Sequence, residues 1–371
     1  MLEIQSFFTE KTQGFHPLPR RFGIKSGRFH LYGPPKSGKT SLALLFAKSF
    51  KHPIYIDCSD PRITPDSLKS QILKSFLEKK LDILILDNYQ PLFTLPNIQN
   101  ILLITHLAPS SITLPEGFTS KLILPLSFEE YISHTASQDS INQLLNRFIK
   151  EGNSPQTLHT PDFHKITRKQ DSMRLFFQDD YLLFLLLLPF QAQKITTNQL
   201  YLHLKKSIKI SKDKLYSTLE RLSAMHFLTL LPMHSPDSTA PTHRPKKLYF
   251  HDFSLPYALT PAPNFQAIFE NMVFLELQKL YTQPITYSDD FHFEVAGKIF
   301  FAIPFPSPSI IERILSKNPK KDITIIAINP IESAPIEVID FISFALQEET
   351  IKEEESIKEA KSIEAGQNKD E

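Results

Sequence analysis

Residues 33–40 constrain the fold of this chain more than any other part of its sequence. They read Gly-Pro-Pro-Lys-Ser-Gly-Lys-Thr and fit the pattern G-x-x-x-x-G-K-[ST]. Residues 28–32 before them have the composition of a short strand, and residues 41–48 after them carry apolar side chains at helical spacing. A strand, a tight loop and a helix N-terminus together present backbone N–H groups and a positive helix end to a polyphosphate. The sequence therefore predicts a phosphate-binding loop on the parallel sheet of an α/β domain.

The side chains of this loop have separate chemical roles. The two glycines permit backbone conformations that a Cβ would block, and the two prolines offer no N–H, so the main donors are expected in the second half of the loop. Lys39 is expected to place its charge beside the β- and γ-phosphates of ATP, and the Thr40 hydroxyl to coordinate Mg²⁺. The alternative is a chance loop, but the flanking strand and helix argue against it. The predicted ATP-binding residues are Gly33, Pro34, Pro35, Lys36, Ser37, Gly38, Lys39, Thr40 and Ser41.

Length, charge and cysteine content narrow the class of protein. A chain of 371 residues is long enough for two or three domains. Its formal net charge of +1 gives no overall attraction to nucleic acid or to a membrane. Cys58 is the single cysteine, which excludes a disulfide framework and is typical of a reducing cytosol. The longest apolar run, Tyr181–Leu188, is too short to span a bilayer and no signal peptide is recognised, so a soluble cytoplasmic protein is expected.

A second acidic element follows the loop. Residues 81–86 are nearly all apolar, as in a strand buried on both faces, and Asp87 and Asn88 follow them. This resembles the Walker B arrangement, in which Asp87 would hold Mg²⁺ together with Thr40. Asn88 stands where hydrolysing proteins carry Glu, and an amide orients water without accepting its proton. The predicted catalytic residues are Lys39, Asp87 and Asn88; the alternative for Asp87 is a plain strand-end cap.

Two further strands are expected in the same sheet. One covers residues 52–58, where Asp57 either faces the nucleotide edge or caps the next turn, and capping is favoured. A helix over residues 65–79 should follow it. The other strand ends at Thr105, with His106 behind it, at the position where some ATPases carry a group near the γ-phosphate. The alternative for His106 is an ordinary loop residue.

Residues 122–124 are predicted as the last strand of this core, and the segment after them resembles a known family. Residues 125–131 match its Pro-Leu-Ser-Phe-x-Glu-Phe/Tyr signature, and residues 146–155 resemble its lid segment, which ends in Gly-Gly-x-Pro. The family comprises prokaryotic AAA+-like ATPases. It has a helical lid, a winged-helix segment and a C-terminal domain similar to the restriction-endonuclease fold. The family's arginine falls at Lys121, and lysine lacks the planar fork for bidentate contacts.

The resemblance covers about residues 20–345 and implies a division into five parts. These are a P-loop ATPase core (1–125), a helical lid (126–180), a winged helix-turn-helix (181–260), a degenerate nuclease-like α+β domain (261–346) and a charged, disordered tail (347–371).

The winged-helix segment is a candidate for binding a partner. Helices are expected to begin near Thr196 and Ser211, with wing strands at residues 227–232 and 247–250. Four basic side chains would give the second helix a positive face that either contacts DNA phosphates or is simply solvated on an interdomain spacer. They are Lys209, Lys212, Lys214 and Arg221.

In nuclease-like folds, a helix such as residues 269–277 precedes strands that carry the Mg²⁺-binding residues. The candidate strands here are residues 293–296 and 301–304, where Ala296 and Pro304 occupy the positions expected for ligands. Without clustered carboxylates the domain has nothing to hold a hard cation. The resemblance therefore implies a nuclease-like shell without nuclease chemistry, in which Glu270 and Glu276 are helix or interface residues.

Two functions remain open from the sequence. The first is an ATP-binding AAA+-like ATPase with slow or partner-dependent hydrolysis, using ATP and Mg²⁺. The second is a nucleotide-sensing regulatory or DNA-binding module with little or no hydrolysis. Either would use a DNA or protein partner through the winged helix and the C-terminal domain, without a membrane, and an oligomer is compatible with both.

Overall fold

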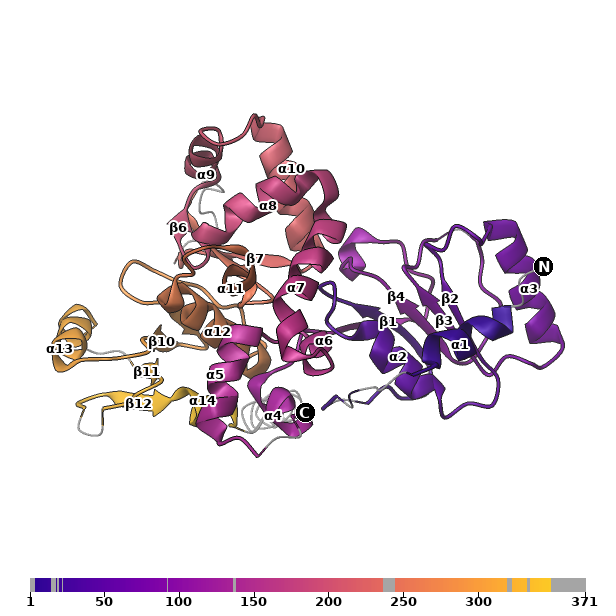
Figure 1. The fold of residues 1–371 in the computed structure, drawn as a ribbon, viewed down its shortest axis with the longest axis horizontal. Coiled ribbons are helices and arrows are strands. Elements are labelled where there is room, and N and C mark those ends of the chain that lie inside the picture. Colours follow the sequence, from indigo (N-terminus) through magenta and orange to yellow (C-terminus); the bar gives the residue numbers. More distant parts are fainter. Residues whose placement is uncertain are drawn as a thin grey trace, which may run out of the picture. The chain divides into compact units, whose positions relative to one another are not determined.

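The computed structural model describes residues 4–14, 18, 20–21, 23–91, 93–135, 138–235, 244–318, 322–331 and 334–347. The chain forms two compact units (Figure 1). Unit 1 comprises Met1–Leu126, Ser154–His159 and Thr218–Phe227, and unit 2 comprises Ser127–Asn153, Thr160–Ser217 and Leu228–Glu371. Of the predicted charged tail (347–371), residues 348–371 lie outside the described residues. Among the described helices, none is long and apolar enough to cross a membrane.

Unit 1 is built on a five-stranded parallel sheet with the order β2-β3-β4-β1-β5. The strands are β1 (Arg28–Tyr32), β2 (Pro53–Asp57), β3 (Ile83–Asp87), β4 (Ile101–Ile104) and β5 (Thr119–Leu122). β3 and β4 are buried along their whole length. Their unbroken Ile and Leu sequences suit strands that are covered on both faces.

Two helices, α2 (Lys39–Ala47) and α3 (Pro65–Leu77), form crossover connections of the parallel sheet, and such connections are right-handed in nearly all proteins. α2 connects β1 to β2 and contacts β3 and β4, α3 connects β2 to β3, and α1 (Ile4–Thr12) contacts β2. The two crossovers run in opposite directions along the sheet, so right-handed connections place α2 and α3 on opposite faces. The connections β3–β4 and β4–β5 run in the same direction as β2–β3 and therefore lie on the α3 face. They contain no α-helix, only the short 3₁₀ turn Pro109–Ser111.

The last strand and the end of one helix in this core differ from the prediction. A strand was expected at residues 122–124, but β5 ends at Leu122, and beyond it Ile123 N donates a single hydrogen bond to Tyr32 O (2.8 Å). β1 ends at Tyr32, so no partner strand continues beside residues 123–124. Lys121 consequently lies inside the strand, paired with Leu31, rather than before it. The helix expected to end at residue 79 ends at Leu77, and its N-cap residue Thr64 makes no side-chain cap.

Unit 2 begins with helices and ends with two small sheets. Its helices are α4 (Phe128–His134), α5 (Ile141–Glu151), α7 (Asp162–Phe177), α8 (Tyr181–Leu187), α9 (Thr197–Leu204), α10 (Lys212–Ala224), α11 (Leu255–Leu259), α12 (Phe265–Leu280), α13 (Pro308–Lys317) and α14 (Phe341–Ala345). The second half of α10 consists of residues assigned to unit 1. β6 (Lys194–Ile195), β7 (Leu228–Pro232) and β8 (Lys246–Phe250) form an antiparallel sheet in the order β6-β8-β7. β9 (Phe293–Val295), β10 (Lys298–Ala302), β11 (Ile323–Ala327) and β12 (Glu337–Asp340) form the second sheet, in the order β12-β11-β10-β9. The short α6 (Pro155–Leu158) belongs to unit 1.

The helices and strands expected between residues 196 and 250 are present. Thr196 and Ser211 accept hydrogen bonds from the backbone N–H groups of Gln199 (3.1 Å) and Lys214 (3.1 Å), so α9 and α10 begin as their sequences indicate. β7 and β8 are the two strands predicted as a wing. The assignment of this segment as a winged helix stays a prediction.

In the C-terminal sheet, the two positions expected to carry metal ligands lie outside the strands. Ala296 has a φ of 51° and, with Gly297 at 78°, forms the tight turn between β9 and β10. Positive φ at both central residues is typical of a two-residue hairpin. Pro304 follows the end of β10. The expected placement of both residues on strands was therefore wrong, because the hairpin turn is shorter than the sequence indicated.

Glu270 and Glu276 on α12 are buried and bonded within unit 2. Glu270 Oε1 accepts hydrogen bonds from Lys247 Nζ (2.7 Å) and Tyr249 OH (2.6 Å), and Glu276 Oε1 accepts one from Phe128 N (2.9 Å). Both carboxylates thus join α12 to neighbouring elements. The structure as a whole confirms the predicted fold class: an α/β chain with a parallel sheet core, followed by helices and a small sheet domain.

Candidate functional site

The candidate site is the loop between β1 and α2. Gly33 has a φ of 138°, and a Cβ at this position would lie 2.4 Å from Ile123 O. No other residue type fits there, because the backbone of the segment after β5 already occupies the space. Gly38, with a φ of 92°, is the last residue before α2 and lets the loop turn into the helix. The two glycines of the sequence motif are therefore required by the backbone itself.

An arginine that the sequence reasoning missed supports the loop from outside. Arg20 Nη1 donates to Ser37 O (2.9 Å), and its Nη2 donates to Leu124 O (3.0 Å) and Pro125 O (3.3 Å). One guanidinium thus connects the second half of the loop to the turn after β5. The planar fork of arginine suits this kind of bridging. No local pattern around residue 20 indicates the role, because its partners are backbone carbonyls far away in sequence.

Lys39 is almost completely buried, with 5% of its surface exposed. Its Nζ donates hydrogen bonds to Gly33 O (2.9 Å) and Pro34 O (2.7 Å), both inside the loop. Burial lowers the pKa of Lys39 to about 7, and the charge of Asp87 opposes that shift. No carboxylate of the described residues forms an ion pair with this ammonium group. A polyphosphate in the loop would supply the missing negative charge.

Beside Lys39 lies His106, the second residue after β4. Its Nδ1 is 3.3 Å from Lys39 Nζ, and burial lowers its pKa to about 4, so the imidazole is neutral near pH 7. Thr105 faces elsewhere: its Oγ1 is 2.8 Å from His30 Nε2 and donates to Leu107 O (2.9 Å). The sequence placed Thr105 nearest the γ-phosphate with His106 behind it. In the structure, His106 is the one that reaches the loop.

Asp87, at the end of β3, meets the loop threonine. Asp87 Oδ2 accepts hydrogen bonds from Thr40 Oγ1 (2.7 Å) and from Tyr55 OH (2.9 Å). Tyr55, on the neighbouring strand β2, was not foreseen, although an aromatic residue with a polar tip in a buried strand usually has a partner. Burial raises the pKa of Tyr55, which keeps its hydroxyl a donor. Asp87 is therefore held in place as more than a strand-end cap.

Asn88 adopts a left-handed backbone conformation with a φ of 50°. Its side-chain amide donates to Asp57 Oδ1 (2.9 Å) and approaches Ser59 Oγ (3.3 Å). Asp57 also accepts from Ser59 N (3.0 Å), which is the capping role that the sequence favoured. The Asn88 amide is thus held by Asp57, and it contributes no basic group beside the loop.

The residues of this site could hold Mg²⁺ and a nucleoside triphosphate. Ser37 Oγ is fully buried and has no hydrogen-bond partner in the described part of the chain, as expected for a group that faces an anion. The Thr40 hydroxyl and the Asp87 carboxylate provide the oxygen ligands that Mg²⁺ prefers. Across the described residues, no group of three or more His, Cys, Asp and Glu side chains gathers around one point. Mg²⁺ at this site would therefore be coordinated by phosphate oxygens and water as well as by these two side chains. The bound ion would neutralise and orient the phosphates.

Comparison with known proteins finds no family model and no curated protein that matches this chain. Among solved structures, it is similar to the ORC1 protein of Aeropyrum pernix in complex with DNA, at 12% identity and a TM-score of 0.31, over 70% of this chain and 93% of that one. It is also similar to AMPPCP-bound DnaA from Aquifex aeolicus, at 12% identity and a TM-score of 0.26, over 75% of this chain and 90% of that one. Both TM-scores are low, so the proposals for this chain rest on its own residues.

Proposed function

We propose that this protein binds Mg-ATP at residues 33–41 and hydrolyses it slowly or only with a partner. The observation that carries the proposal is the hydrogen bond of 2.7 Å between Thr40 and Asp87, two residues far apart in sequence, next to the buried Lys39. This is the arrangement needed to hold a metal ion against phosphates whose charge a lysine neutralises.

A second candidate is a nucleotide-sensing module with little or no hydrolysis. Asn88 favours it, because the residue beside Asp87 is an amide fixed to Asp57 rather than a free carboxylate. In this case ATP would set a conformation that a DNA or protein partner recognises. Both candidates share the ATP site, and they differ in turnover.

The partner would bind through the proposed winged helix or the proposed nuclease-like domain. Of the four basic residues predicted on α10 and before it, Lys214 is paired with Asp180 (2.8 Å), which neutralises its charge. Lys209 and Lys212 form no ion pair with described residues, and Lys212 Nζ lies 5.5 Å from the centre of the Tyr201 ring. A lysine beside an aromatic ring is compatible with contact to a nucleic acid.

ATP binding is tested by thermal unfolding of the full chain. We expect millimolar Mg-ATP to raise the melting temperature of the wild type by mass action, and Lys39→Ala to remove most of that shift. Lys69→Ala is the control, because Lys69 is an exposed lysine on α3 outside the loop, and this variant should keep the shift. A wild type that does not respond to Mg-ATP would refute the proposal.

A further inference from the structure

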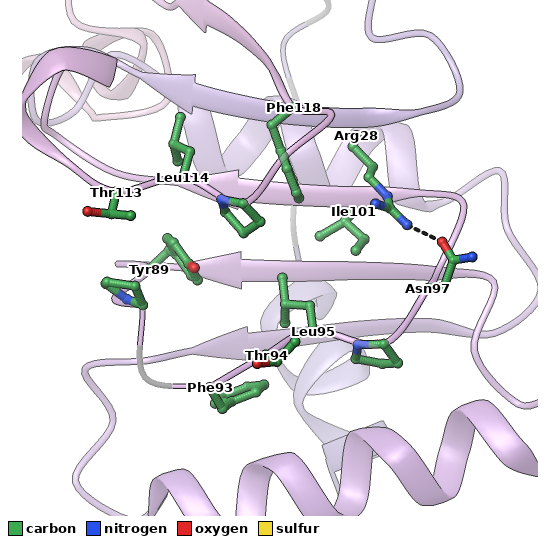
Figure 2. A pocket seen from close by; sticks show the side chains of 13 residues that line it. Arg28, Tyr89, Phe93, Thr94, Leu95, Asn97, Ile101, Thr113, Leu114 and Phe118 are labelled. Carbon is green, nitrogen blue, oxygen red and sulfur yellow. Dashed lines mark hydrogen bonds between the residues drawn. The ribbon is translucent and has the colours of Figure 1, made fainter.

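A pocket of about 490 Å³ lies in unit 1 on the sheet face that no helix covers between β3 and β5 (Figure 2). The connections β3–β4 and β4–β5 cross this face as irregular, proline-containing segments. Its apolar surface includes Ile101 on the sheet, Phe118 just before β5, and Phe93 and Leu114 from the two connections. The volume is in the range of small-molecule sites. No residue of the phosphate-binding loop lines it.

A cation without an acidic partner lies at one end of the pocket. Arg28 Nε donates to Ile98 O (3.0 Å) and its Nη2 to Asn97 Oδ1 (2.5 Å), and both acceptors are neutral. No carboxylate from the described ranges forms an ion pair with Arg28. The guanidinium is half-buried, so its charge is only partly solvated. An anion in the pocket would complete its electrostatic environment.

A hydroxyl group without a hydrogen-bond partner faces the same space. Tyr89 is 5% exposed, and its hydroxyl makes no hydrogen bond to any residue that the structure describes. Figure 2 shows this oxygen directed into the pocket. Burial raises the pKa of Tyr89, so the hydroxyl keeps its proton and is available as a donor.

The backbone positions of Arg28 and Tyr89 are separated along the sheet. Arg28 is the register partner of Ile101, whereas Tyr89 N donates to Ile104 O (3.0 Å) three residues further along β4. Three residues of strand correspond to about 10 Å. The pocket thus has a cationic end, an apolar middle and a hydrogen-bonding end.

We propose that this pocket binds an amphipathic monoanion, with a carboxylate at Arg28 and an apolar body about 10 Å long that reaches towards Tyr89. A small molecule fits better than an extended peptide. β4 and β1 under the pocket are paired on both sides, so they offer no free strand edge for a peptide to join.

The test uses the full chain and titration calorimetry with octanoate, octan-1-ol and octylamine. We expect octanoate to bind saturably and at least tenfold more tightly than octan-1-ol, and octylamine not to bind. Arg28→Met should reduce octanoate affinity to that of octan-1-ol, whereas Arg28→Lys should keep part of the preference. Tyr89→Phe removes only an unbonded hydroxyl, and because octanoate ends in a methyl group that cannot accept its hydrogen bond, octanoate affinity should not fall in this variant.

Two controls separate this site from the ATP site. Lys39→Ala should leave octanoate binding unchanged, and Arg28→Met should keep the thermal shift caused by Mg-ATP. The proposal is refuted by equal affinity for octanoate and octan-1-ol, by unchanged octanoate affinity in Arg28→Met, or by the absence of saturable binding at millimolar concentration.

Discussion

In the proposed ATP site, Asn88 is the residue on which turnover would depend most directly. Replacing it with Glu supplies a carboxylate that can accept a proton from water, and a positioned general base contributes roughly 10²–10⁴-fold in rate. Asn88→Glu should raise ATP hydrolysis by roughly ten- to a hundredfold, with ATP affinity nearly unchanged. Phosphate release at saturating Mg-ATP measures the effect.

The structure adds a constraint on this variant. A Glu at position 88 loses the amide that bonds Asp57 and places two carboxylates together. Asn88→Glu in an Asp57→Asn background removes that repulsion and should show the larger rate. If neither variant exceeds a slow wild-type rate, the missing general base is not the cause of slow turnover. A residue supplied by a neighbouring subunit, with Lys121 as the first candidate, would then be the better explanation.

Because the pKa of Lys39 is lowered, we expect the protein to take up a proton when it binds a nucleotide. With a pKa of about 7, most Lys39 side chains are neutral at pH 8.5, and bound phosphates should restore the charged form. Calorimetric titrations in two buffers of different ionisation enthalpy should show uptake of nearly one proton per Mg-ATP at pH 8.5. The uptake should approach zero at pH 6 after subtraction of the nucleotide's own titration. Equal uptake at both pH values would contradict the role assigned to Lys39.

The same shift has a consequence for stability. The folded pKa of Lys39 is below its unfolded value of 10.5, so the unfolded chain binds more protons between these two values. The contribution of Lys39 to the free energy of unfolding therefore increases as pH rises from about 7 to 10.5.

At the level of elements, β8 and α12 are joined by a buried ion pair. Glu270→Gln leaves Lys247 without its charge partner, and breaking a buried pair typically costs about 3–5 kcal/mol. We expect a clear fall in the urea midpoint of unit 2, monitored by tyrosine fluorescence. Lys247→Met combined with Glu270→Gln should recover part of the loss, because it removes the uncompensated cation. A midpoint unchanged in Glu270→Gln would show that the pair is not structural.

The elements also show why the sequence prediction was good in some places and poor in others. Strands β3 and β4 were foreseen because a run of Ile and Leu can only be buried on both faces. The start of β5 was misplaced, because Thr119 and Ser120 are polar and their strand exists only through pairing with β1. The turn at Ala296 was missed for a similar reason: nothing but the hairpin geometry demands its positive φ.

At the level of the whole molecule, the DNA hypothesis makes a measurable prediction. Lys209 and Lys212, if they contact phosphates, each contribute to the salt dependence of DNA affinity. Their joint replacement by Gln should reduce the slope of log K against log salt concentration by about 2. The slope is measured by fluorescence anisotropy with duplex DNA. Salt concentrations from about 50 to 200 mM are suitable, because phosphate contacts change DNA affinity strongly over this range. The control is Lys69→Gln on α3, an exposed lysine that should leave the slope unchanged. An unchanged slope in the double variant would assign both lysines to a solvated face.

The sequence by itself determined the loop between a strand and a helix at residues 33–40, the acidic strand end at Asp87 and the α/β class, because each depends on residues that are close together in the chain. A glycine pattern followed by a helix, or an apolar run followed by an acid, carries its meaning locally. Only the tertiary structure decided that Thr40 meets Asp87, that Arg20 supports the loop, that His106 rather than Thr105 lies beside Lys39, and that Arg28 and Tyr89 face one pocket. Each of these pairs joins residues from different strands or loops. Their proximity depends on the order of the strands in the sheet and on the absence of helices from two of the connections. No local sequence pattern predicts either feature.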